Sequence, residues 1–221
     1  MSNKKSNGPE RVAQTPHEKF ILEIYSEIDK AITKELERLR IKNIVPSCIK
    51  ECYFCCRQEV PLVIPEAHAL GQYIKRYFSD NQKSELRIKT LDWFKWVKNE
   101  LPKHGNTSED EMEAFYSYGP YCPLLVDGKC SAYPVRPVVC RVHYVSSSPD
   151  SCRSYTDTQS AQNEPTGLDT ISYAVQPFTM LIRESIEGPG VNFDDVTLLL
   201  PQWLAMELGW EDLLPQQIDS I

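Results

Sequence analysis

The eight cysteines of the chain fall into two short runs, and this clustering constrains the fold more than any other sequence feature. The first run, CIKECYFCC at residues 48–56, has C-x3-C-x2-C-C spacing. The second run lies within residues 122–152, and no cysteine lies outside the two. The cysteines are Cys48, Cys52, Cys55 and Cys56 in the first run, and Cys122, Cys130, Cys140 and Cys152 in the second.

The second run is rich in proline, and the whole chain has 16 prolines against 9 glycines. Loops of this kind bury little apolar surface, whereas fixing each residue costs ~1–2 kcal/mol of conformational entropy. Something must therefore hold the loops in place. The cysteines are the evident candidates, because they are concentrated in those same segments.

Three kinds of cysteine chemistry fit an even number of thiols in two runs. Four disulfides would fix the loops, but the N-terminal residues lack the apolar segment of a secretion signal. This predicts a cytoplasmic protein, in which thiols stay reduced. The sequence CYFC could be a redox pair with lowered thiol pKa values. A thioredoxin-like site needs a βαβ context, however, and the sequence does not predict one.

Metal ligation is the explanation we favour, because a thiolate is a soft anionic ligand that selects zinc or an iron–sulphur cluster. Adjacent side chains such as Cys55 and Cys56 diverge in extended backbone. We therefore expect one to join the site of its own run and the other to reach a second site or the facing run. Eight thiolates allow two four-cysteine sites, or one cluster and a zinc ion. We place an iron–sulphur cluster of the [4Fe–4S] type ahead of zinc, because three thiolates at x3 and x2 spacing fit one cubane.

Apolar residues at helical spacing predict a mainly α fold, with helices wrapped around an irregular, proline-rich, cysteine-bound metal centre. The segment 59–65, EVPLVIP, is either a short strand or an extended loop. Ser108 and Glu111 have the spacing of a capping box that starts a further short helix. The other predicted helices cover residues 17–40, 66–78, 84–101, 167–187 and 193–214.

The same patterns divide the chain into three parts. Residues 1–15 are predicted to be a disordered tail. Residues 16–160 form a cysteine-cluster metal-binding domain with an N-terminal helix and a helical insert. Residues 161–221 form an acidic helical C-terminal extension packed on that domain.

The net charge of −7 argues against general nucleic-acid binding, which needs many phosphate-neutralising cations. No run approaches the ~18 apolar residues that span a bilayer, so we expect no membrane association. Basic residues prevail over residues 75–103, and residues 184–221 contain acids but no Lys or Arg. Either segment could meet a protein partner. The aromatic and lysine residues of LDWFKWVK could stack on bases, but an amphipathic helix explains them more simply.

Several residues near the second run are candidates for a role beside the metal. Arg136 and Arg141 flank Cys140, and they could clamp an anionic cofactor, neutralise the thiolates or pair with acids such as Asp127; we favour neutralisation or pairing over the clamp. Tyr133 could hydrogen-bond to sulphur or to a ligand. His143 is an alternative metal ligand, although eight cysteines make it unnecessary.

Together, CIKECYFCC and CPLLVDGKCSAYPVRPVVCR resemble the YkgJ or CxxCxxCC type of cysteine-cluster family, a zinc- or iron-chelating domain. The resemblance covers about residues 46–152. It implies metal chelation by all eight cysteines and little about a reaction. The family includes relatives similar to a flagellin lysine N-methylase with an iron–sulphur cluster. An iron–sulphur-dependent protein-modifying enzyme and a zinc-stabilised protein-interaction module are therefore the alternatives to a role in metal binding alone.

Overall fold

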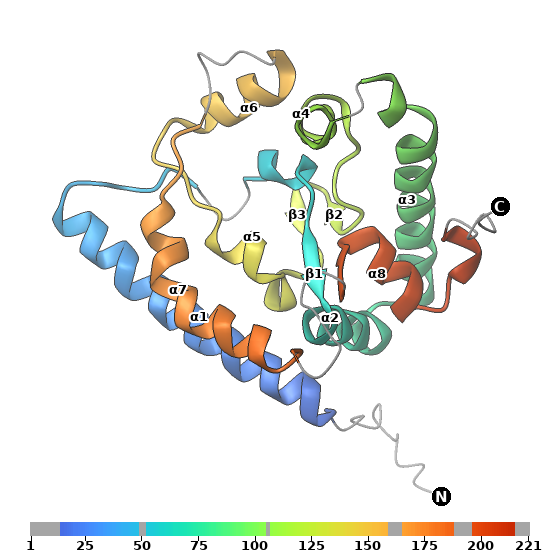
Figure 1. Cartoon of the computed structure of the whole chain (residues 1–221), viewed down its shortest axis with the longest axis horizontal. Helices are drawn as coiled ribbons and strands as arrows, with labels where there is room; N and C mark the ends of the chain where they lie inside the picture. The colour runs from blue at the N-terminus through green and yellow to red at the C-terminus, as the bar shows by residue number, and fades with distance from the viewer. Residues whose placement is uncertain (1–13, 49–51, 105–106, 159–164, 188–195, 215–221) are drawn as a thin grey trace, which may run out of the picture.

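The computed structural model describes residues 14–48, 52–104, 107–158, 165–187 and 196–214. These residues are mainly helical, as the sequence predicts. Figure 1 shows α1 and α7 side by side along one edge, α3 and α8 on the other side, and α5 with the short strands between them. The predicted disordered tail lies almost wholly outside the described residues.

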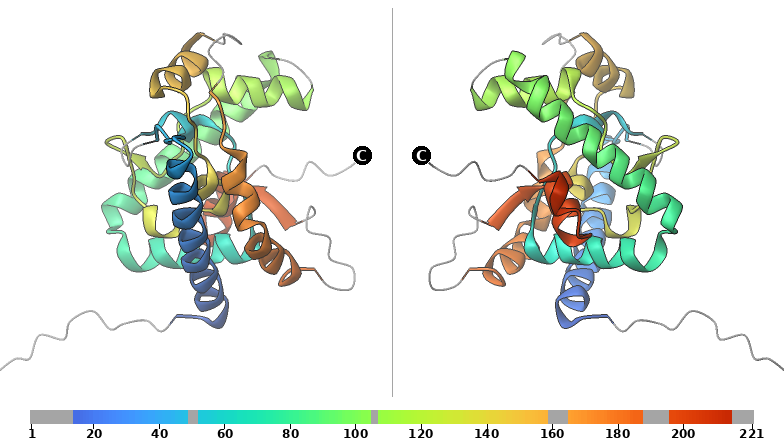
Figure 2. Two further views of the ribbon diagram at one scale, coloured as in Figure 1. Left: turned by 90° about the vertical axis from the view of Figure 1, so that its left-hand side faces the viewer. Right: turned by 90° about the vertical axis from the view of Figure 1, so that its right-hand side faces the viewer.

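Helix α1 (Pro16–Ile41) matches the predicted helix 17–40 closely. The hydroxyl of Thr15 accepts a hydrogen bond from the Glu18 N–H and caps the first turn. One apolar stripe is buried against α7 (Asp169–Glu184), and the side views in Figure 2 show the two helices running next to each other. The stripe on α1 includes Ile21, Ile28, Ile32 and Leu39.

The predicted helix at residues 193–214 is only partly correct. Strand β4 (Thr197–Leu199) occupies its first described part and pairs antiparallel with β1 (Pro61–Val63). Helix α8 (Leu200–Glu207) follows, with Pro201 in its first turn. The run VTLLL contains β-branched residues that suit a strand, and β1 supplies the partner that sequence periodicity could not show.

Helices α2 (Ile64–Tyr77), α3 (Asp80–Asn99) and α4 (Ser108–Tyr118) form the predicted helical insert between the two cysteine runs. The capping box of α4 is formed by Thr107 and Asp110, one residue earlier than the predicted pair. Its Thr107 hydroxyl accepts from the Asp110 N–H, so the helix begins one residue earlier than the box at Ser108 implied.

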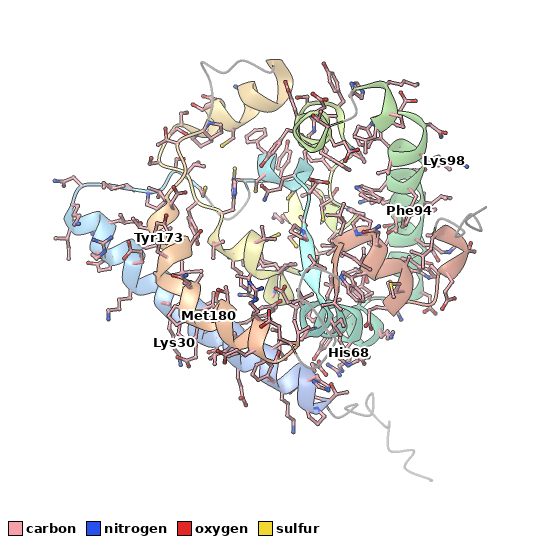
Figure 3. All side chains as sticks on the ribbon, in the orientation of Figure 1. Lys30, His68, Phe94, Lys98, Tyr173 and Met180 are labelled. Atoms are coloured by element: carbon pink, nitrogen blue, oxygen red, sulfur yellow. The ribbon has the colours of Figure 1, made fainter. Side chains whose placement is uncertain are left out.

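Helix α3 carries the mixed aromatic and basic sequence LDWFKWVK. Figure 3 labels Phe94 and Lys98 along it. Trp93 is buried against Phe115, and Trp96 packs against the same cluster. The amphipathic-helix interpretation accounts for these aromatic residues. None of the helices in the described ranges is both long and apolar enough to cross a membrane.

The cysteine-bearing segments are short irregular elements, as their prolines predict. The first run enters a 3₁₀ turn, Phe54–Arg57. The second run contains β2 (Leu125–Val126), β3 (Lys129–Cys130), the 3₁₀ turn Tyr133–Val135, α5 (Val138–Val142) and α6 (Pro149–Thr158).

The expectation that these proline-rich loops bury little apolar surface needs correction. The second run contributes Leu124, Ala132 and Val135 to the largest apolar cluster, together with residues of α2 and α8. Cys122, Cys130 and Cys140 pack against that cluster. The cysteines therefore lie at the edge of a hydrophobic core, and burial supplies part of the ordering free energy of the loops.

The C-terminal segment is distributed over the fold. Helix α7 completes the cluster under α1, whereas α8 packs on α2 and α3, and its Trp203 indole donates to the Leu62 carbonyl at 2.9 Å. The predicted division into a domain and an extension stays a prediction. The described residues share cores across its boundary.

An ion pair joins α1 to α2 and gives the fold a pH dependence. Both carboxylate oxygens of Glu18 accept from the Arg76 guanidinium, at 2.7 and 3.1 Å, and the Glu18 side chain is 3% exposed. These hydrogen bonds hold the pKa of Glu18 below its ordinary value, against the effect of burial. The stabilisation is therefore present above the unfolded-state pKa of about 4.3 and is lost as pH falls through the lower folded-state pKa.

We expect Glu18→Gln to lower the free energy of unfolding at pH 7 by about 2 kcal/mol, because the charge-assisted bonds are lost. The variant should also lose less stability than the wild type between pH 5 and pH 3. Urea unfolding at both pH values checks this. Equal acid losses in the two proteins would contradict it.

Candidate metal centre

The fold brings the two cysteine runs together. The Cys122 N–H donates to the Cys56 carbonyl at 2.7 Å. At the other end of the first run, the Val145 N–H donates to the Cys48 sulphur at 3.4 Å. The Ser47 N–H donates to the Val145 carbonyl at 2.9 Å. Both ends of the first run are thus tied by backbone groups to the second run, although a helical insert separates the runs in the sequence.

A partly open void of about 100 Å³, which we call the inner cavity, lies where the runs meet. Its floor is apolar and includes Val60, Leu124 and Leu200. Six cysteines from both runs contribute to its lining: Cys52, Cys55, Cys56, Cys122, Cys130 and Cys140.

A wider void of about 360 Å³, the outer cavity, adjoins it. Cys48, Cys52 and Cys55 of the first run line it together with Cys140. Its remaining lining residues are Tyr133, Arg136, His143 and Tyr144.

Cys152 belongs electrostatically to the outer group. Burial raises the pKa of Cys152 to about 11, and the nearby thiols of Cys52, Cys48 and Cys55 add to the rise. Cys152 is carried by α6, whose first turn begins at Pro149. The eighth cysteine of the sequence is therefore near three cysteines of the first run.

Burial dominates the chemistry of the inner thiols. It raises the pKa of Cys122 and of Cys140, and the neighbouring thiols raise both further. A hydrogen bond with the Cys56 thiol, together with burial, raises the pKa of Cys55. Several thiolates can be held together here only if a cation compensates their charge.

The backbone at Cys55 and Cys56 is not extended. They lie in a 3₁₀ turn and line the same cavity. Cys55 also lines the outer cavity, whereas Cys56 contacts only the inner one. Cys55 therefore stands between the two groups.

The two predicted arginines have different positions. Arg136 lines both cavities, and its guanidinium carbon lies 3.9 Å from the centre of the Tyr133 ring. Its Nε is buried without a hydrogen-bond partner among the described residues. Tyr133 itself is 41% exposed and lines both cavities.

Arg141 is turned away from the thiols and lines neither cavity described above. It is 3% exposed, and its guanidinium contacts α1, where it donates to both carboxylate oxygens of Asp29 at 2.8 Å and lies 4.1 Å from the Tyr25 ring centre. It also donates to the carbonyls of Pro134 and Arg136. Arg141 anchors the second run to α1, and its predicted place beside a cofactor stays a prediction.

Sequence reasoning missed Glu66, the acid that positions α5. Its buried carboxylate accepts from the Val138 N–H at 2.9 Å and from the Tyr25 hydroxyl at 3.0 Å. Burial raises the pKa of Glu66. It caps the short helix that carries Cys140. An acid within an apolar stretch was the only available signal, because its partners lie far away in the sequence.

All eight cysteines are free thiols. In the described ranges, no three His, Cys, Asp or Glu side chains converge closely enough to hold a single ion as they are placed. Cysteines from both runs instead line the two cavities. His143 lines the outer cavity, and burial lowers the pKa of its imidazole.

Comparisons with protein-family models, with curated proteins and with solved structures find no match to this chain.

Proposed function

We propose that the protein binds an iron–sulphur cluster of the [4Fe–4S] type, or zinc, through thiolates from both cysteine runs. The single observation that carries the proposal is the inner cavity, which six cysteines from both runs line above an apolar floor. Soft thiolates shielded from water are the donor set that iron–sulphur clusters and structural zinc sites require.

The grouping of the thiols supports two four-cysteine sites. The outer site would use Cys48, Cys52, Cys55 and Cys152, because the first three line the outer cavity and each of them raises the pKa of Cys152. The inner site would use Cys56 and the remaining second-run cysteines, Cys122, Cys130 and Cys140. The hydrogen bond from Cys122 N–H to the Cys56 carbonyl fixes Cys56 beside its proposed partners.

The size of the inner cavity favours a cluster over a single ion. A zinc ion holds its four sulphur ligands at about 2.3 Å, and no void remains between them. The inner cavity of about 100 Å³ instead exceeds the space that one water molecule needs in a cavity. A polyatomic cluster would use that space, whereas zinc would require the thiols to close in.

The chain's own residues would govern loading through protons and charge. Because burial raises the pKa of the inner thiols, each ligand must lose a proton as metal binds. Arg136 opposes the burial effect at Cys130 and Cys140 and supplies positive charge beside them. A bound cluster would contribute electron-transfer or Lewis-acid chemistry at this place.

The alternative is an iron–sulphur-dependent protein-modifying enzyme of the lysine N-methylase type. The outer cavity of about 360 Å³ favours it, because a catalytic centre needs space beside the metal. A zinc-stabilised interaction module has no comparable support from the site. We propose a cytoplasmic location, since reduced thiols are needed for either metal.

Metal analysis of anaerobically purified protein tests the proposal. We expect iron and acid-labile sulphide in similar amounts, with broad visible absorption; zinc without colour would support the second metal. Cys48→Ser should empty only the outer site and Cys56→Ser only the inner one, so each variant keeps about half of the metal.

Val45→Ser is the matched control, because it adds a serine next to the first run at a position that is 66% exposed. It should keep the full metal content. If either cysteine variant loses all metal, the division into two sites is wrong. Wild-type protein without iron or zinc would refute the metal function itself.

A further inference from the structure

Four of the residues that line the outer cavity are not needed as metal ligands. They are Tyr133, Arg136, His143 and Tyr144, and they share this cavity of about 360 Å³ with four cysteines. None of the described residues that line the outer cavity is an Asp or a Glu. Its non-cysteine side chains can all donate hydrogen bonds, and one carries a permanent positive charge.

Among these four lining residues, Arg136 carries the permanent positive charge. Its buried Nε has no hydrogen-bond partner in the described part of the chain, and a buried donor left unsatisfied costs about 1–3 kcal/mol. Its guanidinium stacks on Tyr133 at 3.9 Å, which fixes the orientation of the plane. Stacking occupies one face of the group and leaves its edges free to donate.

Arg141 is a useful comparison for Arg136, because Arg141 pairs with an acidic residue and Arg136 does not pair with one among the described residues. The two arginines flank the same cysteine, and both stack on a tyrosine. Arg141 also has the Asp29 carboxylate and two carbonyls as acceptors. Arg136 has the stacking partner but no such acceptor within the described ranges.

We propose that the outer cavity binds a small molecule through a carboxylate group, which the Arg136 guanidinium holds with two parallel hydrogen bonds. The fork of an arginine matches the two oxygens of a carboxylate, and such charge-assisted pairs are stronger than neutral ones. Tyr133 fixes the fork, and Tyr144 and His143 border the remainder of the ligand. This inference rests on the proposed function of the cysteines that line the same cavity, which would be held as metal thiolates.

Neutralisation of the thiolates is the competing role for Arg136. The guanidinium partly offsets the effect of burial on the pKa of Cys130 and Cys140, so part of its charge acts on the sulphur atoms. The two roles are compatible, because an arginine has five N–H donors. An added anion separates the two roles. If Arg136 only neutralises the thiolates, the anion should not change the stability of the protein, whereas if Arg136 binds the anion, the protein should become more stable.

Acetate is the probe, and acetamide is its neutral control of the same shape. Metal-loaded and metal-free forms of the full chain are titrated with each compound at constant ionic strength and pH 7, and the melting temperature is recorded. We expect acetate to raise the melting temperature of the metal-loaded wild type in a saturable way, and acetamide to have no effect. Isothermal titration calorimetry gives the dissociation constant.

Arg136→Gln should weaken acetate binding by tenfold or more, because the charge and one arm of the fork are lost. Arg136→Lys keeps the charge without the fork and should bind with intermediate affinity; it also serves if the glutamine variant does not fold. Arg40→Gln is the matched control, because it removes one charge from an exposed site on α1.

Equal effects of acetate and acetamide on the wild type would overturn the proposal, and so would equal acetate binding by the wild type and Arg136→Gln. Metal content is measured in the same samples. Acetate binding that persists in metal-free protein supports the arginine site even if the metal function fails. If the melting temperature of metal-loaded protein does not respond to acetate, the only role left for Arg136 is to neutralise the thiolates.

Discussion

Replacing Cys140 with serine is expected to empty the inner cavity of metal and to lower the melting temperature of the protein by roughly 10 °C or more. A structural metal contributes its binding free energy to folding, and loss of one of four ligands removes several kcal/mol of it. For a chain of this size, each kcal/mol corresponds to about 2–4 °C. Metal content and thermal unfolding of anaerobically purified protein measure both effects.

Val139→Ala is the matched control for this experiment. Val139 is on the same short helix and packs against the same apolar cluster, but it carries no donor. Its truncation should cost about 1 kcal/mol and leave the metal content unchanged. A chelator provides the second comparison: once metal is removed, wild type and Cys140→Ser should melt within a few degrees of each other.

The prediction fails if Cys140→Ser keeps the wild-type metal content and melting temperature. It also fails if the stripped wild type remains much more stable than the stripped variant. That second result would assign the effect of Cys140 to packing against the apolar cluster, where its burial places it, and not to ligation.

The sequence was sufficient to predict the elements that are marked by a local pattern of apolar residues. The apolar stripe of residues 17–40 predicted α1 within one residue at each end, because its helical period has no strong competitor. The prediction of a continuous helix through the segment VTLLLPQW was wrong. Its strand exists only because β1 lies beside it, and that pairing joins residues far apart in the chain.

The sequence was sufficient to predict that the two cysteine runs come together. It was not sufficient to predict which of the neighbouring side chains face the cysteines. Thiols from two runs were expected to meet, and the inner cavity has both runs in its lining. Arg136 and Arg141 looked equivalent in the sequence, since each is close to Cys140. Which of them faces the thiols depends on Asp29 of α1 and on the short α5, and no local pattern contains that information.

The apolar floor of the site was also missed. Leu124 and Val135 are separated by prolines and turns, so they show neither a helical nor a strand period. They enter the core because β2, β3 and the following 3₁₀ turn fold back over α2. Burial of irregular segments is a tertiary property that periodicity does not detect.

Arg141→Met is the second change for which we expect a large effect: a loss of about 3–5 kcal/mol in the free energy of unfolding. Methionine fills much of the same volume but cannot donate to the carbonyls of Pro134 and Arg136 or to the Asp29 carboxylate. Removal of one member from a buried network of charge-assisted hydrogen bonds has costs of this order. Urea unfolding of metal-free protein measures it directly.

Two milder variants separate the bonds of this network. Asp29→Asn should cost only about 1 kcal/mol, because the Asp29 side chain is 53% exposed and water can replace part of the lost interaction. Arg141→Lys keeps the charge but has no fork to reach three acceptors at once, so it should fall between the other two. The order of stability should be wild type, Asp29→Asn, Arg141→Lys, Arg141→Met.

The same variants decide whether Arg141 acts on the fold or on the metal. An anchor between α1 and the second run should destabilise metal-free and metal-loaded protein by similar amounts, and the absorption spectrum of the bound centre should not change. If Arg141→Met altered the spectrum, or weakened only the metal-loaded form, the side chain would be acting on the thiolates. The role of Arg141 as an anchor would then be wrong, because each nitrogen of its guanidinium already donates to Asp29 or to a backbone carbonyl.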